Sequence, residues 1–265
     1  MLPANIMHIT FIGTCSGTEP MAGRHHCSFA IEHDSSIYWF DAGECCSYTG
    51  YLAGIDLPAT KAIFISHTHM DHIGGLPNLL WTLRKLTSVS ADAMRRLTDQ
   101  SVDVLIPDLG VWEGILRILA GTEGGFRIPF HLDARDYQDG VVYEKNGVRV
   151  IAYHNNHLGD SEPHRSFSFR IEAGSKVIVY SGDVRSIEDF AQLIDGCDLL
   201  LMETGHHKVE DVCVYLRDSG KRFGRLGFIH HGRAILHDPE GELRKAGKIL
   251  GDRVFIANDG MTAEL

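Results

Sequence analysis

The motif Ser-His-Thr-His-Met-Asp-His at residues 66–72 carries three imidazoles and one carboxylate within six residues. It follows the apolar run Ala62–Ile65, which indicates a buried strand, and it precedes two consecutive glycines. Side chains two residues apart in an extended chain point the same way. His67 and His69 can therefore converge on one ion.

Asp71 and His72 are adjacent and must diverge, so the simplest use of both as ligands is a second ion beside the first. Imidazole nitrogen suits zinc and similar divalent ions, and carboxylate oxygen bridges or tightens them. Paired ions can hold a hydroxide at neutral pH. The motif therefore predicts two divalent metal ions as cofactors. Zinc is the default, and manganese or iron would fit the same ligands.

Charge and cysteine usage limit the classes of partner. A net charge of −10 at pH 7 gives the chain no general attraction for nucleic acid or anionic membranes, so we expect no strong nucleic-acid patch. Six cysteines without a C-x-x-C pair favour reduced thiols in a cytoplasmic protein. Residues 1–5 lack the pattern of a signal peptide. No apolar segment approaches the ~20 residues that span a membrane.

Apolar runs separated by glycine, proline and polar turns predict an alternation of strands and helices. Strands are expected at Ile6–Ile12, Ser28–Glu32, Ile37–Phe40, Ala62–Ile65, Val102–Ile106, Phe126–Leu132, Val148–Tyr153, Lys176–Tyr180, Asp198–Met202 and Leu226–Ile229, with a short closing strand within 254–261. Helices are expected at Leu76–Arg84, Val111–Ala120, Val209–Arg217 and Glu240–Leu250, and residues 85–101 are expected to form a surface helix or loop.

The pattern His67-x-His69-x-Asp71-His72 resembles the signature of the metallo-β-lactamase-fold hydrolases, a superfamily of binuclear metal enzymes. Further motifs are similar to the opening and the end of ribonuclease Z and its relatives, namely Gly13-Thr14-Cys15-Ser16-Gly17, Arg24, Asp41-Ala42-Gly43-Glu44 and Ala257-x-Asp259-Gly260. The resemblance implies an α/β fold, an αββα sandwich of two mixed sheets with helices on the outer faces. It also implies that Asp41 supports the metal loop. The elements follow one another without a linker, so we expect a single hydrolase domain over residues 1–265.

The resemblance implies further ligands at distant strand ends. His157 matches the third motif, with His154 as its competitor, and His230 matches the fifth, with His231 as its competitor. Asp183 ends a strand after a glycine that lets the backbone pass close to a ligand, which suits a carboxylate bridging two ions. One ion would be held by His67, His69 and His157 and the other by Asp71, His72 and His230, with Asp183 between them.

The resemblance also implies catalytic residues. In ribonuclease Z and similar phosphodiesterases a strand-end glutamate is closely followed by a histidine that protonates the leaving group. Glu203 and His207 fit that pairing, and His206 could take the role instead. A neighbouring carboxylate would orient the ring and raise its pKa. Asp71 is expected to act in catalysis as well as in metal binding.

These features favour a phosphodiesterase in which the ions lower the pKa of a bridging water from ~16 towards ~7. The acidic composition favours a nucleotide-like or other small-molecule phosphodiester. The alternatives are hydrolysis of sulfate esters, lactones or thioesters at the same site, and a non-catalytic metal-binding protein. Transfer RNA 3′-processing is disfavoured because residues 107–150 contain nothing like the basic arm of ribonuclease Z. Family habit suggests a homodimer.

Overall fold

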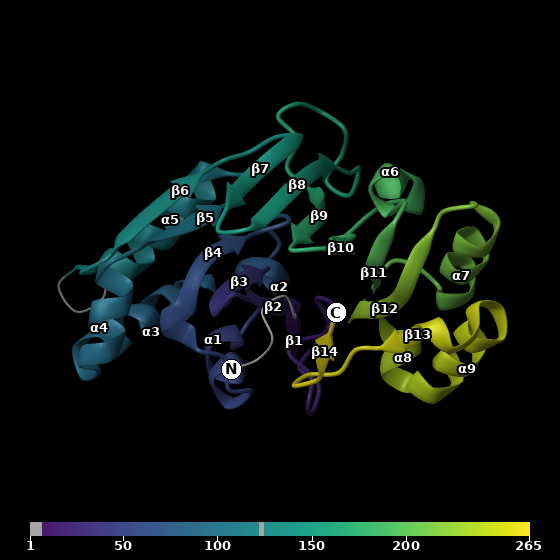
Figure 1. Ribbon diagram of the computed structural model, residues 1–265, viewed down its shortest axis with the longest axis horizontal. Coiled ribbons are helices and arrows are strands. Elements are labelled where there is room, and N and C mark those ends of the chain that lie inside the picture. The colour runs from purple at the N-terminus through teal and green to yellow at the C-terminus, as the bar shows by residue number, and fades with distance from the viewer. Residues whose placement is uncertain (1–6, 122–124) are drawn as a thin grey trace. The chain divides into compact units, whose positions relative to one another are not determined.

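The computed structural model describes residues 7–121 and 125–265. The first predicted strand begins at Ile6, which lies outside these residues, as does the segment tested for a signal peptide. Two compact units divide the chain (Figure 1). Unit 1 takes in the described parts of Met1–Gly13, His25–Tyr137 and Gly260–Glu264, and unit 2 takes in Thr14–Arg24, Gln138–Asp259 and Leu265. The predicted single domain stays a prediction.

Unit 1 is built on a seven-stranded mixed sheet. Its strands, in spatial order, are β14 (Thr262–Glu264), β1 (His8–Gly13), β2 (Ser28–His33), β3 (Ser36–Phe40), β4 (Thr60–Phe64), β5 (Ser101–Leu105) and β6 (His131–Arg135). The pairs from β14 to β3 are antiparallel, and those from β3 to β6 are parallel. The sheet therefore changes from antiparallel to parallel pairing at β3.

Helices bury one face of the unit 1 sheet. They are α1 (Cys46–Leu52), η1 (Leu57–Ala59), α2 (Met70–Ile73), α3 (Leu76–Val89), α4 (Ala91–Thr98) and α5 (Leu109–Ala120). In α3 the buried residues are Leu76, Leu79, Leu80 and Leu83, the spacing of a single helical face. They pack in one cluster with Ile63 of the sheet. This core holds β4 in place, and the metal-motif loop follows β4.

Unit 2 is built on a second seven-stranded mixed sheet with the same plan. Its strands, in spatial order, are β13 (Val254–Ile256), β12 (Phe223–His231), β11 (Cys197–Thr204), β10 (Lys176–Tyr180), β9 (Phe167–Ala173), β8 (Val148–His154) and β7 (Gly140–Lys145). The pairs from β7 to β10 are antiparallel, and those from β10 to β13 are parallel. The two mixed sheets expected from the sequence are thus confirmed.

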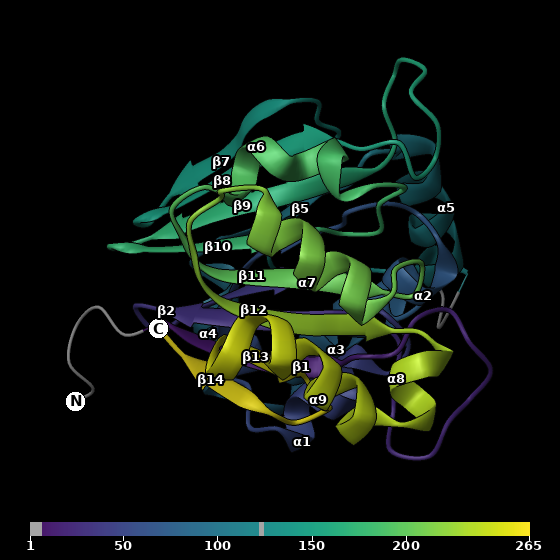
Figure 2. The same cartoon turned by 90° about the vertical axis from the view of Figure 1, so that its right-hand side faces the viewer.

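The helices of unit 2 are η2 (Ile187–Phe190), α6 (Ala191–Ile194), α7 (Val209–Asp218), α8 (Arg233–His237), α9 (Pro239–Leu250) and η3 (Gly251–Arg253). Figure 2 shows α7 and α9 lying across one face of this sheet. Val212 and Leu216 of α7 share a buried cluster with Leu200 and Leu226 of the strands. Within the described residues no helix has the length and apolar character needed to cross a membrane.

The structure corrects the boundaries of the middle segment. The strand predicted at Phe126–Leu132 is wrong, because β6 begins only at His131. Pro129 has no backbone N–H to donate to a ladder, and Phe126 and Ile128 pack against the core from irregular chain instead. The prediction also missed β7, whose mostly exposed residues give no apolar run, and the inner strand β9, whose apolar residues alternate with polar ones. Residues 85–101 are more regular than expected, since α3 runs to Val89 and α4 follows it.

Candidate functional site

In unit 1 the metal motif forms a short extended segment and the first turn of a helix. β4 ends at Phe64, and His69 is still extended, with φ −67° and ψ 150°, before α2 begins at Met70. Asp71 and His72 therefore lie on a helical turn, where successive side chains point about 100° apart. This switch in backbone conformation separates the motif into two pairs.

The two pairs bring their donor atoms together. His67 Nε2 lies 3.1 Å from His69 Nδ1, and His72 Nε2 lies 3.4 Å from Asp71 Oδ2. Two ligands each about 2.0–2.1 Å from one tetrahedral zinc ion are separated by roughly 3.4 Å. We call His67, His69, Asp71 and His72 the unit 1 cluster. Its spacing fits divalent ions with nitrogen and oxygen ligands.

Asp41, the residue after β3, supports the unit 1 cluster. It is fully buried, and its Oδ1 accepts a hydrogen bond from the Ser66 backbone N–H at 2.7 Å. Its Oδ2 lies 2.8 Å from both Ser66 Oγ and His72 Nδ1. A carboxylate on one ring nitrogen fixes the orientation of the imidazole and presents the other nitrogen to a metal. Asp41 thus makes the contacts expected of a residue that supports the metal loop.

Ser66 is a functional candidate that the sequence analysis missed. Its hydroxyl bonds Asp41 and also lies 3.1 Å from His67 Nδ1, so it links the carboxylate to a second imidazole. The sequence feature that could have identified it is a hydroxyl residue between the buried strand and the first histidine of the motif. Cys27 also lies close to Asp41 and His72. Because both Asp41 oxygens accept hydrogen bonds, we interpret Cys27, Asp41 and His72 as residues that support the loop and not as a further metal site.

In unit 2 Asp183 stands between two imidazoles. It follows β10 and Gly182, whose φ of +56° favours glycine. Asp183 Oδ2 lies 3.7 Å from His157 Nε2, and Asp183 Oδ1 lies 3.3 Å from His230 Nε2. We call His157, Asp183 and His230 the unit 2 cluster. His206 Nδ1 also lies 3.9 Å from Asp183 Oδ2. A carboxylate whose two oxygens face different imidazoles suits a ligand shared between two ions.

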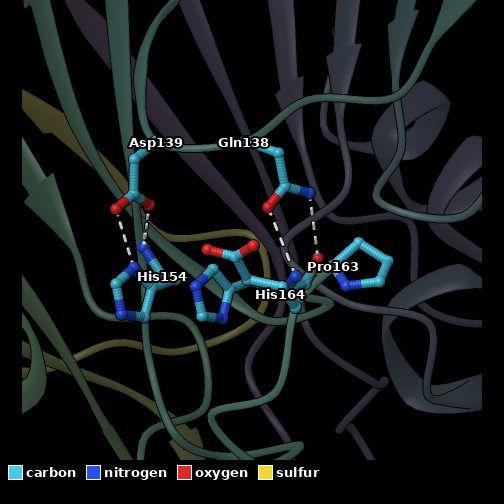
Figure 3. A pocket seen from close by; sticks show the side chains of 6 residues that line it. Gln138, Asp139, His154, Pro163 and His164 are labelled. Carbon is cyan, nitrogen blue, oxygen red and sulfur yellow. Dashed lines mark hydrogen bonds and ion pairs between the residues drawn. The ribbon is translucent and has the colours of Figure 1, made fainter.

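His154, the competitor of His157, is held in a different environment. Its backbone N–H donates to Asp139 Oδ1 at 2.6 Å, and its Nδ1 lies 2.7 Å from Asp139 Oδ2 (Figure 3). Its ring stacks on His164, with centroids 3.8 Å apart. Both rings line a cavity of about 700 Å³ together with Gln138. The structure thus brings His157, and not His154, to Asp183.

His231, the competitor of His230, is committed to a structural contact. It is fully buried, and its Nε2 lies 2.7 Å from the Ala257 carbonyl oxygen. Burial lowers the pKa of His231 to about 3, so the ring is neutral and its Nε2 donates the bond. His230 takes a left-handed φ of +52°, which turns its ring toward Asp183.

Gly205 makes room for the His230 ring. A Cβ atom at position 205 would lie 2.8 Å from His230 Nδ1, closer than real Cβ contacts. The backbone must therefore pass directly beside the imidazole, and only glycine allows this approach.

The hydrogen-bonded partner of Glu203 is His206, whereas the sequence analysis paired it with His207. His206 Nδ1 lies 2.9 Å from Glu203 Oε1, and the His206 backbone N–H donates to Oε2 at 2.9 Å. His207 Nε2 instead lies 3.0 Å from the Val184 carbonyl oxygen and 3.6 Å from Glu203 Oε1. The chain turns within Gly205–His207, so residue spacing alone could not decide which ring faces the carboxylate.

The Glu203–His206 pair favours a charged imidazole. The hydrogen bond to Glu203 raises the pKa of His206 above its ordinary value, although partial burial opposes the rise. Burial raises the pKa of Glu203, but the hydrogen bond to His206 and the neighbouring His230 imidazole outweigh it and hold that pKa below its usual range. The His206 side chain is 46% exposed, so it can hold a proton and also reach a ligand.

A model of the beta-lactamase superfamily domain matches residues 49–231 of this chain. The match covers more than half of the 265 residues and includes all seven residues of the two clusters. The chain therefore belongs to the beta-lactamase superfamily.

Individual relatives and solved structures show which members of the superfamily the chain resembles. The ribonuclease Z of Methanothermobacter thermautotrophicus is 26% identical over 244 residues, which cover 75% of this chain and 74% of that protein. The metallo-β-lactamase fold protein YhfI of Bacillus subtilis matches with a TM-score of 0.76 at 17% identity, over 98% of this chain and 100% of that structure. The short form of human tRNase Z matches with a TM-score of 0.73 at 19% identity, over 97% and 98%.

These matches confirm the resemblance and the αββα fold class expected from the sequence. The protein is a hydrolase with a ribonuclease Z-like sequence. The fold implies divalent metal binding, and each unit supplies histidine and aspartate donors for it.

Proposed function

We propose that the protein is a binuclear metal-dependent phosphodiesterase acting on a nucleotide-like or other small phosphodiester. The two units would act as one hydrolase domain, and their clusters would jointly hold two divalent ions, zinc by default. The proposed ligands are His67, His69, Asp71, His72, His157, Asp183 and His230. The observation that carries the proposal is the hydrogen-bonded Glu203–His206 pair in the same unit as Asp183 and His230. Phosphodiester cleavage needs a proton donor at the leaving oxygen.

The metal ions, when bound, would neutralise charge on the phosphoryl oxygens and activate the attacking water. The remaining chemistry belongs to side chains of this chain. Asp41 and Ser66 hold the rings of His72 and His67 in orientation. Asp71, only partly buried, would accept a hydrogen bond from the attacking water and orient it. No side chain needs to act as a nucleophile.

His206 is the proton donor in this proposal, in place of His207. Its pKa is raised by the hydrogen bond to Glu203, which favours the protonated ring. Its Nδ1 is turned to Glu203, which leaves Nε2 to protonate the departing oxygen. Glu203 is fully buried and keeps this ring in one tautomer and one orientation. His207 would instead fix the Val184 backbone.

RNA cleavage is the second candidate, because the curated relatives are ribonucleases Z. The small-substrate proposal is supported by the net charge of −10. It is also supported by the described parts of residues 107–150, where α5, β6 and β7 follow one another without an extended basic arm. Hydrolysis of sulfate esters, lactones or thioesters remains the alternative reaction at the same ligands.

The first experiment measures hydrolysis of bis(p-nitrophenyl) phosphate by metal-loaded protein and by the His206→Ala and His207→Ala variants. We expect turnover by the native chain. A dinucleoside phosphate, whose alkoxide leaving group needs a proton, is assayed beside it, and for this substrate we expect a loss of about 10²–10⁴-fold in His206→Ala and a far smaller loss in His207→Ala. His237→Ala, an exposed change on α8, is the control. Metal per chain is measured in every sample. A native protein with two ions per chain and no turnover would contradict the phosphodiesterase.

A precursor transfer RNA is assayed in parallel to separate the two candidates. Faster cleavage of this RNA than of small diesters would favour the ribonuclease. Equal loss of activity in His207→Ala and His206→Ala would contradict the assignment of the proton donor.

A further inference from the structure

Several cations of unit 2 are paired with an acid. Arg170 bonds Glu172, Arg222 bonds Asp195, and Arg233 bonds Glu19. Arg185 and Lys208 are exposed and, like Arg165 and Lys248, make no side-chain hydrogen bond or ion pair with any described residue. The chain holds 35 acidic residues, so acids to pair with these two cations were plentiful.

The backbone places these two cations beside the reactive groups of unit 2. Asp183 is followed by Val184 and Arg185, and His206 is followed by His207 and Lys208. Val184 and His207 are in direct contact, since the Val184 carbonyl oxygen lies 3.0 Å from His207 Nε2. The Val184 N–H also donates to Glu203 Oε1 at 3.3 Å. Arg185 and Lys208 thus follow two residues that one hydrogen bond joins.

Their distance from the reactive groups suits a neighbouring anionic group. Two residues of chain span at most about 7 Å, so each cation is anchored within that distance of Asp183 or His206. The scissile phosphate is already served by the proposed ligands and by His206. Guanidinium binds phosphate oxygens through a planar fork of N–H groups, and ammonium binds them as a point charge.

We propose that Arg185 and Lys208 form a subsite for a second phosphate of the substrate, one nucleoside away from the scissile diester. The proposal rests on the proposed phosphodiesterase and names its substrate class as a phosphodiester that also carries a phosphate on the nucleoside. Neither side chain takes part in bond breaking. Their role is to position the substrate, so their loss raises KM for substrates that have the second phosphate.

The kinetic experiment uses two substrates that differ only in this group. These are thymidine 5′-(p-nitrophenyl phosphate) and the same compound with a 3′-phosphate, assayed on metal-loaded protein. We expect the native protein to show a KM about tenfold lower for the bisphosphate form, the effect of one to two charge-assisted hydrogen bonds. In Arg185→Ala and Lys208→Ala this ratio should fall towards one, and Arg185→Lys should retain part of it.

A binding experiment gives a readout that does not depend on turnover. Calorimetry compares thymidine 3′,5′-bisphosphate with thymidine 5′-monophosphate on the same proteins. We expect the native preference for the bisphosphate to be lost in the Arg185→Ala/Lys208→Ala double variant. Lys248→Ala, which removes an exposed cation of α9, is the matched control and should keep the native preference.

The outcomes separate the two proposals. Hydrolysis of both thymidine substrates with a KM ratio that the variants leave unchanged would overturn the subsite while leaving the phosphodiesterase standing. No hydrolysis of either substrate by native protein with two ions per chain would contradict the phosphodiesterase itself. In that case an unaltered bisphosphate preference in the double variant would overturn the subsite as well.

Discussion

The β2–β3 hairpin of unit 1 and the β9–β10 hairpin of unit 2 are two copies of one structure. Phe29 pairs with Phe40 in the first and Phe169 with Tyr180 in the second, so the register is the same with an offset of 140 residues. Even one side-chain bond is repeated. Ser28 Oγ donates to the carbonyl of residue 41 at 3.0 Å, and Ser168 Oγ donates to that of residue 181 at 2.5 Å.

The two hairpins differ in the position of the carboxylate that follows the second strand. In unit 1 it is Asp41, the first residue after the strand, which is buried and bonded to Ser66 and His72. In unit 2 the first residue is Ser181, whose hydroxyl accepts the Glu203 N–H at 3.0 Å, and the carboxylate comes two residues later at Asp183. A shift of two residues thus changes a supporting carboxylate into a proposed ligand.

The largest expected effect tests the unit 2 side of this comparison. Asp183→Ala removes the carboxylate that faces His157 and His230. We expect less than the full complement of two ions per chain, and kcat/KM for bis(p-nitrophenyl) phosphate lower by roughly 10³-fold or more, because the ions supply several kcal/mol. Metal analysis and steady-state kinetics check this. Native metal content with native kinetics would show that Asp183 is only a turn residue.

Changes at the two equivalent positions come next. Asp41→Asn should lower metal affinity by about 10–100-fold, because the ring of His72 loses its carboxylate partner. Ser181→Ala should leave metal affinity within a few-fold, because Ser181 contacts the Glu203 backbone and no member of the unit 2 cluster. Competition with a chromogenic chelator measures both. Equal losses of metal affinity would mean that Asp41 and Ser181 contribute equally to metal binding.

A smaller effect on metal binding is expected at Ser66, whose hydroxyl bonds Asp41 and lies close to His67. Ser66→Ala should weaken metal binding by less than Asp41→Asn does, because the Ser66 backbone N–H still reaches Asp41. The Asp41→Asn/Ser66→Ala double variant should lose less than the sum of the single losses, since the groups form one network. Strict additivity in the same chelator competition would argue against that network.

The smallest expected effect is on stability, and it distinguishes the two hairpins by the charged side chains that they carry. Burial raises the pKa of Glu172, but hydrogen bonds from Arg170 and Arg149 outweigh it and hold the pKa below its ordinary value. A depressed pKa stabilises the fold above the unfolded value near 4.5, and this stabilisation is lost as pH falls through the folded value. Glu172→Gln should therefore cost about 0.5–1 kcal/mol at neutral pH and less in acid.

The equivalent residue of unit 1, Glu32, is the matched control. It has no arginine partner among the described residues, and Ala30 stands where unit 2 has Arg170. Urea unfolding at several pH values compares Glu32→Gln with Glu172→Gln. A cost in Glu32→Gln equal to that in Glu172→Gln would show that the ion pairs contribute nothing.

Much of this architecture could be predicted from the sequence, because its signals are local. Most of the buried strands have apolar runs, and the spacing of the unit 1 cluster forces two pairs of donors. The inner strand β9 has no such run, because its apolar residues alternate with polar ones, and it was missed. Edge strands such as β7 and β14 lack that signal because much of their surface is exposed. The choice of His206 over His207 depends on how the chain turns after Glu203, and residue spacing does not contain that path. The contact of His154 with Asp139, which lies in the connection between β6 and β7, likewise has no signal in the local sequence.

The close approach of Gly205 to the His230 ring has a consequence for recognising related chains. Because a Cβ at position 205 would collide with that imidazole, a glycine two residues after the strand-end glutamate accompanies this ring position. A larger residue at this position requires a different placement of the backbone or of the histidine. We therefore expect Glu-x-Gly-His to mark related chains that keep this placement of the ring.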